Sequence, residues 1–158
     1  MVAEASKQAG PIYTPGTFQS ADSVGALIGV ARKVLVEEFD RELAPLGLNT
    51  AQALVLILLA DGRAATAAGI CKHLSHDPGA MTRIVDKLET LEAVRRVRGG
   101  DDRRSSRLEL TRRGKQMHAE VTRVQVAVLN RALRGFSPGE ARTLERLLRR
   151  LLGNVGAP

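Results

Sequence analysis

One predicted helix, followed directly by two strand-like segments, constrains the fold of this chain more than any other feature. Asp77 followed by Pro78 is a strong helix start, because aspartate caps free N–H groups and proline suits the first helical position. Apolar residues then recur at helical spacing on one face, at Met81, Ile84, Val85, Leu88 and Leu91. The opposite face is polar and basic, so we expect it to lie at the surface.

A shorter helix is predicted just before this one. Thr66 can cap it, and its inner face would hold Ala67, Ile70, Cys71 and Leu74. Only about four residues then join the two helices, which is typical of a helix-turn-helix. An ordinary helical hairpin in a bundle has the same pattern, so this pair alone leaves both interpretations open.

The segment after the second helix favours the DNA-binding interpretation. Residues 94–98 and 107–110 can each form a short strand, and GGDDRRSS (99–106) lies between them with turn residues and arginines. A basic β-hairpin directly after a helix-turn-helix is a wing, and its arginines can enter an adjacent minor groove. A solvated loop is the alternative for this segment.

The distribution of charge also indicates a polyanionic partner. The 158 residues include 24 Lys and Arg and 17 Asp and Glu, for a formal net charge of +7. Neutralising phosphates releases counterions, so such a balance favours nucleic acid. The charge is concentrated in residues 95–115, where the basic residues are Arg95, Arg96, Arg98, Arg103, Arg104, Arg107, Arg112, Arg113 and Lys115. The alternative explanation for the net charge is that the protein is soluble and basic without binding nucleic acid.

Long helices are predicted on both sides of this region. Asp22 is the predicted N-cap of the first, whose apolar stripe runs from Val24 to Leu43. Thr111 caps another long helix with a coiled-coil-like seam at Leu110, Met117, Val121, Val124 and Val128. Ser137 and Pro138 start a leucine-rich final helix. We expect the first and last helices to form the interface of a homodimer.

These elements predict a mainly α fold, a winged helix-turn-helix with a small β-hairpin wing and long N- and C-terminal dimerisation helices. The predicted division is a flexible N-terminal arm (1–21), an N-terminal dimerisation helix (22–46), a DNA-binding lobe (47–112) and C-terminal dimerisation helices (113–158). The N-terminus does not resemble a signal peptide, and no apolar run approaches the roughly 20 residues that span a bilayer. We therefore expect a cytoplasmic protein with no membrane partner.

Enzymatic and metal chemistry find little support in the sequence. GxxxxGK[ST] and HExxH are absent from it, and we expect neither catalytic residues nor a cofactor. Cys71, His73 and His76 suggest a metal sensor, but residues two apart on a helix point about 200° apart. A redox switch would need a second cysteine to resolve the oxidised thiol. We expect no metal site and leave any redox role of Cys71 open.

Three stretches resemble the MarR-type regulators, a bacterial family named for multiple antibiotic resistance. GLNTAQALVLILLA (47–60) is similar to the family's second helix, LSHDPGAMTRIVDKLETLEAV (74–94) to its recognition helix, and DDRRSSRLELTRRG (101–114) to its wing. The order and spacing match over residues 22–152. The usual glycine after the recognition helix is replaced around Glu92 and Ala93, so that helix is expected to run on or to end differently.

The resemblance implies a triangular homodimer that binds double-stranded DNA. It further implies a ligand-responsive repressor with a pseudo-palindromic operator and a small-molecule effector, for which we name no pocket residues. By the same resemblance, Asp102 braces the wing and Arg104, next to Arg103, is inserted into the minor groove. The remaining predicted DNA contacts are in the recognition helix, at Gly79, Ala80, Thr82, Arg83 and Lys87.

The chemistry of these side chains suits DNA. Arg83 can donate two hydrogen bonds to guanine O6 and N7, or it can clamp a phosphate. Thr82 can hydrogen-bond a phosphate or place its methyl group on thymine, and the small Gly79 and Ala80 let the helix N-terminus approach the backbone. The remaining candidates are phosphate contacts or merely solvated side chains, namely Lys72, His76, Lys87, Arg95 and Arg96.

Two other functions use the same scaffold. One is a winged-helix metal or redox sensor, and the other is a winged-helix module that binds a protein or RNA without sequence-specific DNA binding. The module would show no preference for duplex DNA and little loss of affinity with salt, whereas a regulator should show a steep salt dependence and a preferred, roughly palindromic site.

Overall fold

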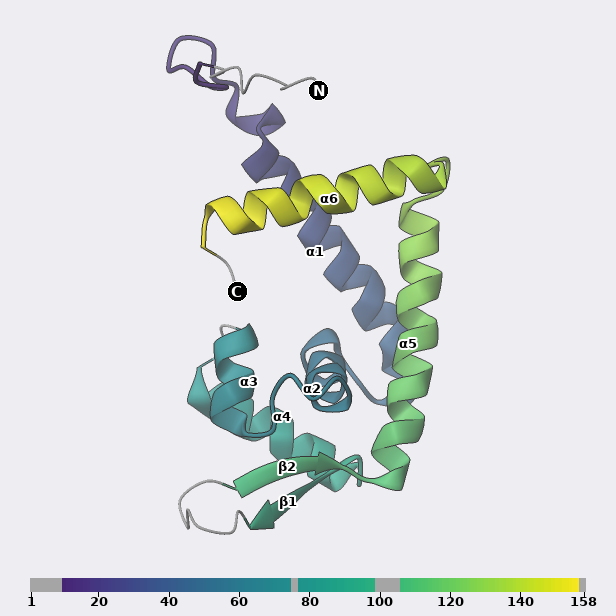
Figure 1. The fold of residues 1–158 in the computed structure, drawn as a ribbon. Coiled ribbons are helices and arrows are strands. Elements are labelled where there is room, and N and C mark those ends of the chain that lie inside the picture. The colour runs from purple at the N-terminus through teal and green to yellow at the C-terminus, as the bar shows by residue number, and fades with distance from the viewer. Residues whose placement is uncertain (1–9, 75–76, 99–105, 157–158) are drawn as a thin grey trace, which may run out of the picture. The chain divides into compact units, whose positions relative to one another are not determined.

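The computed structural model describes residues 10–74, 77–98 and 106–156, and the chain divides into two compact units, Met1–Leu35 and Val36–Pro158. The fold is mainly α with one antiparallel hairpin, which confirms the predicted class (Figure 1). In chain order the elements are η1 (Ser20–Asp22), α1 (Val24–Leu43), η2 (Ala44–Leu46), α2 (Thr50–Ala60), α3 (Ala67–Leu74), α4 (Pro78–Thr90), β1 (Val94–Arg98), β2 (Ser106–Leu110), α5 (Arg112–Ala132) and α6 (Pro138–Asn154).

The start of α1 differs from the prediction. Asp22 lies in the short 3-10 turn η1, so its assignment as the N-cap was wrong. Ser23 takes that role because its backbone is extended and its Oγ accepts the Ala26 N–H at 3.2 Å. The Tyr13 hydroxyl accepts the Val24 N–H at 3.0 Å. In this first unit, α1 has several exposed apolar side chains, at Val24, Leu27, Ile28, Val30 and Val34.

The helix starts of the second unit follow the local signals in the sequence. Asn49 Oδ1 accepts the Gln52 N–H at 3.0 Å, and Gln52 Oε1 accepts the Asn49 N–H at 2.9 Å. Ser137 and Glu140 form the same reciprocal capping box at α6. The other predicted caps that accept an N–H are Thr66, Asp77 and Thr111. The predicted helix starts at Thr66, Asp77, Thr111 and Ser137 are confirmed.

Helix α2 forms the centre of the second unit. Ala53, Val55, Leu56 and Leu58 are buried on it, as expected for a helix that is apolar almost all round. The inner faces of the other elements cover it with a continuous core that includes Ile70, Met81, Val85, Leu88, Leu108 and Val121. The predicted seam of α5 therefore packs largely within the chain, against this core.

The hairpin has a single register, with Val94 opposite Leu110 and Arg98 opposite Ser106. Strand β2 starts one residue earlier than predicted. The link before α3 adds a contact that the sequence did not indicate: the Leu108 N–H donates to the Ala65 carbonyl at 2.8 Å, beside an isolated bridge from Thr66. This contact ties the base of the hairpin to the start of the helix-turn-helix.

The end of α4 shows how the chain accommodates the missing glycine. The helix ends at Thr90, and Glu92 takes a left-handed backbone with φ of 55°. The Ala93 N–H donates to the Leu88 carbonyl at 2.9 Å, and the Glu92 N–H donates to the Glu89 carbonyl at 2.8 Å. These are the two hydrogen bonds of a Schellman C-cap, which normally places glycine at the position of Glu92.

We expect Glu92→Gly to raise the free energy of unfolding by about 1 kcal/mol, because glycine adopts a positive φ without the strain that a Cβ imposes. The ion pair that this change removes is weak, since Arg113 Nη1 lies 3.9 Å from Glu92 Oε2 and both side chains are mostly exposed. Urea denaturation measures the gain. Glu92→Ala is the control, and an equal gain from alanine would contradict this explanation.

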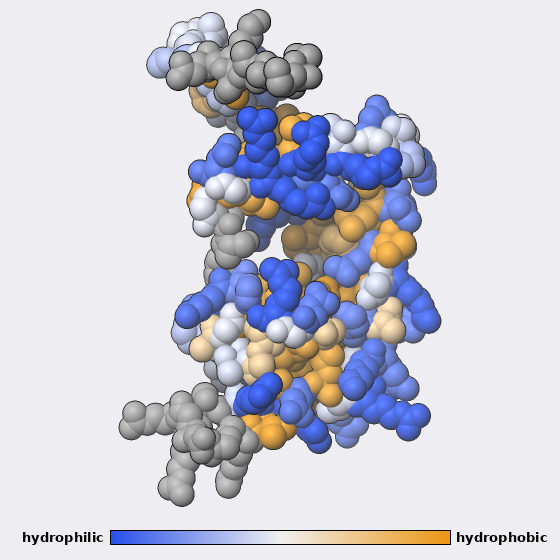
Figure 2. Space-filling view, in the orientation of Figure 1, coloured by the Kyte–Doolittle hydropathy of each residue, from blue (hydrophilic) through white to orange (hydrophobic). Residues whose placement is uncertain are grey.

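Helix α6 follows α5 after a turn and has no buried residue. Its leucines are exposed by 38–49% at Leu144, Leu147, Leu148 and Leu152. The surface over α6, in the upper half of Figure 2, is largely blue, the colour of hydrophilic residues. An apolar stripe of this kind on a single chain indicates a surface that another molecule covers.

Within the described residues, no single helix has both the length and the apolar composition needed to cross a membrane. One bent pair, Val24–Leu46 with Thr50–Ala60, reaches that length and composition together. Its second member is the buried core helix α2.

Candidate DNA-binding surface

The outer face of α4 brings together the recognition-helix residues that the sequence predicted. Gly79, Thr82, Arg83 and Lys87 are exposed, and Ala80 is partly buried. The buried residues of this helix, Met81, Val85 and Leu88, anchor its other face in the core. The structure therefore presents these five residues on a rigid element, and their contacts with DNA remain a prediction.

The N-terminus of α4 is already occupied by its own cap. Asp77 Oδ1 accepts the Ala80 N–H at 2.9 Å. This hydrogen bond, with smaller contributions from the Gly79 N–H and the charge of Arg83, lowers the pKa of Asp77 against the opposing effect of desolvation. A phosphate approaching these amides would have to displace the carboxylate. Gly79 leaves room for the cap, since a Cβ there would lie 3.1 Å from Asp77 Oδ1.

Thr82 also makes a bond within its own helix. Its Oγ1 donates to the Pro78 carbonyl at 2.9 Å, so the hydroxyl proton is engaged. The side chain can still accept a hydrogen bond and present its methyl group. Arg83 is exposed one residue further along, and its guanidinium keeps the donors needed for a guanine or a phosphate.

The first strand of the hairpin carries two arginines that the sequence could not distinguish. Arg95 Nη2 lies 2.8 Å from Glu109 Oε2 on the neighbouring strand. Arg96 instead contacts two carboxylates of α4, Asp86 at 2.7 Å and Glu89 at 2.6 Å. The hydrogen bond with Asp86 and the charges of both carboxylates raise the pKa of Arg96, although desolvation acts against them.

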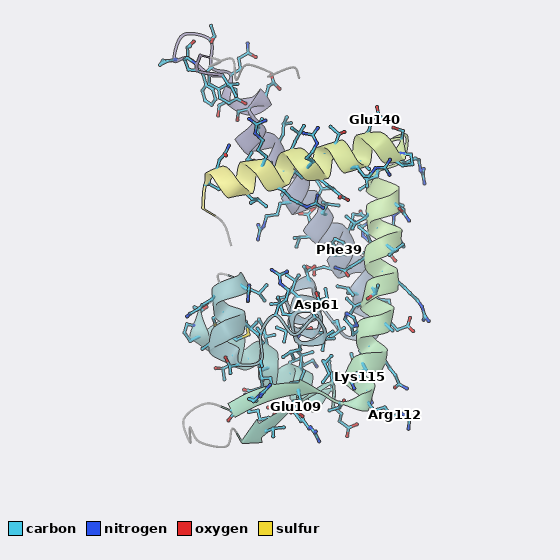
Figure 3. All side chains as sticks on the ribbon, viewed as in Figure 1. Phe39, Asp61, Glu109, Arg112, Lys115 and Glu140 are labelled. Atoms are coloured by element: carbon cyan, nitrogen blue, oxygen red, sulfur yellow. The ribbon has the colours of Figure 1, made fainter. Side chains whose placement is uncertain are left out.

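The tip of the wing lies outside the described residues. It includes three predicted contacts, Asp102, Arg103 and Arg104, and the same holds for His76 before α4. Nearer the base, Arg107 and Lys115 line a surface groove of about 380 Å³, together with Glu109. Arg112 and Lys115 extend from the first turn of α5 (Figure 3).

A close junction joins the end of α4 to the start of α5. Thr111 Oγ1 donates to the Glu92 carbonyl, and the Thr111 N–H donates to the Ala93 carbonyl at 3.1 Å. A Cβ added at Gly114 would lie 1.9 Å from the Ala93 carbonyl oxygen. This approach gives a physical reason for glycine four residues after Leu110, and it fixes the position where the wing leaves the helices.

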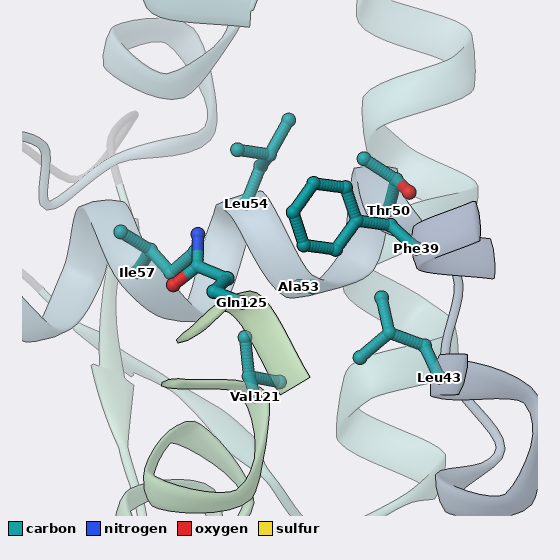
Figure 4. A pocket seen from close by; sticks show the side chains of 8 residues that line it. All are labelled: Phe39, Leu43, Thr50, Ala53, Leu54, Ile57, Val121 and Gln125. Carbon is teal, nitrogen blue, oxygen red and sulfur yellow. The ribbon is translucent and has the colours of Figure 1, made fainter. Parts of the chain in front are cut away.

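A small apolar cavity of about 60 Å³ lies between α2, α5 and the end of α1 (Figure 4). Its lining residues are Phe39, Leu43, Thr50, Ala53, Leu54, Ile57, Val121 and Gln125. Thr50 Oγ1 is buried without a hydrogen-bond partner among the described residues. The sequence did not indicate this cavity, because distant parts of the chain supply its lining and no local motif marks it.

Cys71 is partly buried on α3. His73 Nε2 lies 3.2 Å from the Arg63 carbonyl oxygen. Across the described ranges, no three residues of the types His, Cys, Asp and Glu are grouped to hold a metal ion.

Residues 46–105 of the chain match the sequence model of the MarR family. The chain is also 30% identical over 128 residues to an HTH-type transcriptional repressor of Mycobacterium tuberculosis, a match that covers 81% of this chain and 92% of the relative.

Two solved structures extend the similarity to the fold. A crystal structure of a mutant MarR from Escherichia coli complexed with operator DNA has a TM-score of 0.72 and 28% identity, and the match covers 81% of this chain and 92% of that one. A Mycobacterium tuberculosis MarR family protein in complex with p-aminosalicylic acid has a TM-score of 0.70 and 29% identity, over 82% of this chain and 98% of that one.

Proposed function

The chain belongs to the MarR family of transcriptional regulators, and from this premise we propose that it is a ligand-responsive repressor that binds a pseudo-palindromic operator as a homodimer. The observation that carries the proposal is the exposed polar face of α4 beside a two-stranded hairpin. Such a helix fits the major groove, and such a hairpin reaches the neighbouring minor groove.

Within each subunit, base reading falls to α4. Arg83 contacts a guanine edge, while Thr82 and Lys87 contact the DNA backbone and Gly79 and Ala80 allow the helix to approach it. The resemblance adds the wing, where Asp102 braces the hairpin and Arg103 and Arg104 supply positive charge for the minor groove. Support comes from the relative that was crystallised with operator DNA.

The exposed leucines of α6 support the homodimer. Exposure of 40% at Leu144 and 48% at Leu147 is costly for a helix in water, and a second copy of the same helix would cover these side chains. A two-fold symmetric protein recognises two half-sites in inverted order, about one helical turn of DNA apart.

The cavity between α2 and α5 supports a small aromatic acid as the effector. Its walls are mostly apolar, Thr50 offers an unused hydroxyl, and Gln125 also lines the cavity. At about 60 Å³ it is far smaller than the roughly 300–1,000 Å³ of typical ligand pockets. An effector therefore has to open it and so shift the helices around the core, which links its occupancy to DNA binding. The relative bound to p-aminosalicylic acid supports this class of ligand.

Selection of bound duplexes from a random library tests the proposal. We expect the enriched sequences to share an inverted repeat whose half-sites are about 10 base pairs apart, centre to centre. A pool that stays random, or one enriched in a single unrepeated motif, would contradict an operator read by a symmetric dimer.

Arg83→Ala is expected to cost about 1–3 kcal/mol of discrimination at one base pair of each half-site, because a bidentate contact to guanine is lost. The measurement compares affinities for the selected operator and for operators substituted at each position. Lys87→Ala is the matched control on the same face, and we expect it to weaken all duplexes alike. If both variants lose affinity uniformly, Arg83 is a phosphate clamp.

Thr50→Val is expected to raise the free energy of unfolding by about 1 kcal/mol, since it removes a buried hydroxyl without a partner. It should also weaken the binding of salicylate, seen as a smaller rise in Tm at the same ligand concentration. Thr122→Val, at an exposed position on α5, should change neither quantity. If salicylate raises the Tm of wild type and of Thr50→Val by the same amount, this cavity has no role in binding salicylate.

A further inference from the structure

Arg96 lies on the inner side of the hairpin. Side chains alternate along a strand, so Arg96 shares a face with Val94, which is buried. It stands opposite Leu108, which is also buried, while Arg95 lies on the other face with Glu109. The guanidinium of Arg96 is therefore directed toward the helices, although the sequence alone placed it among the phosphate candidates.

Two carboxylates of the recognition helix hold this guanidinium. Arg96 Nη2 lies 2.7 Å from Asp86 Oδ1, and Arg96 Nη1 lies 2.6 Å from Glu89 Oε2. Asp86 and Glu89 are three residues apart and so lie on one side of α4. The guanidinium thus joins the strand to the helix through two separate nitrogen atoms, which fixes its direction as well as its distance.

The position of Asp86 is unfavourable for a surface that meets phosphates. It lies three residues after Arg83, and its side chain is 55% exposed. A carboxylate near phosphate repels it, so on charge alone the chain would bind DNA better without this group. Exposed ion pairs also contribute little to stability. Neither charge nor stability accounts for Asp86, whereas the geometry of the hairpin does.

We propose that Arg96, held by Asp86 and Glu89, is a positioning residue that fixes the hairpin at the angle to α4 at which both contact one operator half-site. The inference rests on the proposed function, since it requires that α4 and the hairpin both touch DNA. A hairpin held in place before binding loses less conformational freedom when it binds. Loss of the ion pair therefore weakens the specific complex, in which both elements must fit together.

The competing role for Arg96 is a direct phosphate contact. In that case removal of Asp86 frees the guanidinium and strengthens binding to every duplex, and removal of Arg96 weakens every duplex and reduces the salt dependence. The two roles predict opposite signs for the same substitution.

The test measures affinities of Asp86→Asn, Arg96→Gln and the double variant for the operator selected by wild type and for a scrambled duplex. We expect Asp86→Asn to bind the operator about tenfold more weakly and the scrambled duplex no more weakly. The double variant should bind the operator no more weakly than Arg96→Gln alone, since both substitutions break the same ion pair. Glu120→Gln is the matched control, because it removes a carboxylate paired with Arg123 on α5, and it should not weaken operator binding.

Operator binding by Asp86→Asn that equals or exceeds that of wild type would overturn the proposal. Thermal unfolding checks each variant. If Arg96→Gln unfolds early, the exchanged pair Asp86→Arg with Arg96→Asp replaces it and should bind the operator better than Asp86→Arg alone. No gain from the exchange would also overturn the proposal. A wild-type protein without operator preference would instead refute the proposed function itself.

Discussion

Gly114→Ala is expected to lower the free energy of unfolding by about 3 kcal/mol or more, the upper range for an overpacked site. The added Cβ would lie 1.9 Å from the Ala93 carbonyl oxygen and 2.9 Å from the Ala93 carbonyl carbon. Backbone rather than a flexible side chain occupies that space, so the start of α5 has to move away. That movement also breaks the hydrogen bond from the Thr111 N–H to Ala93.

Thermal and urea unfolding measure this loss, which for a chain of this length corresponds to a fall in Tm of roughly 10 °C. Gly153→Ala is the matched control. It lies in α6 with no atom within 4 Å of an added Cβ, so alanine there should be neutral or slightly stabilising. Equal stabilities for Gly114→Ala and wild type would show that the two backbones do not meet as described.

Leu148→Asp is expected to abolish dimerisation and to weaken operator binding by about 100-fold or more, because a monomer loses the avidity of two linked half-site contacts. The side chain lies on the apolar stripe of α6 and is 38% exposed in the single chain. A carboxylate at that position would be buried unpaired in the proposed interface.

Sedimentation equilibrium and operator titration read out the two consequences of Leu148→Asp separately. Arg146→Asp is the control, since it introduces the same carboxylate on the opposite side of α6 and changes the net charge by one unit more. We expect it to remain dimeric. A dimeric Leu148→Asp variant with wild-type operator affinity would place the subunit interface elsewhere.

Local signals in the sequence predicted most of the helix boundaries. A cap and its N–H donor are three residues apart, so the pairs Asn49 with Gln52 and Ser137 with Glu140 need no tertiary information. The start of α1 was misplaced by one residue because Asp22 and Ser23 are both good caps. The preceding 3-10 turn, which the sequence did not indicate, determines which of them is used.

A strained helix end and contacts between separate elements could not be predicted in the same way. The end of α4 depends on backbone hydrogen bonds that hold Glu92 in a left-handed conformation, which its side chain does not favour. The different partners of Arg95 and Arg96 follow from the register of the hairpin, and one residue of slippage would exchange their faces. The cavity beside Thr50 could not be predicted either, because residues from three separate helices line it.

Local signals also predicted only part of the candidate site. The periodicity of residues 78–90 was enough to place Thr82 and Arg83 on an exposed face. The cap at Asp77 was predicted as well, but the sequence analysis did not use its consequence, which is that the carboxylate occupies amides that a DNA phosphate would otherwise meet. The assignments at the wing tip, including Arg104, come from the resemblance to the family and stay predictions.

Fluorescence anisotropy of the wild-type protein tests the central claim most directly. The titration uses the intergenic DNA beside the gene and a scrambled duplex of equal length and composition, over a series of salt concentrations. The account predicts binding as a dimer, an affinity that falls steeply with salt, and at least about a thousandfold preference for the intergenic duplex. Weak and equal binding to both duplexes would contradict it, and would leave only non-specific attraction between a basic protein and DNA.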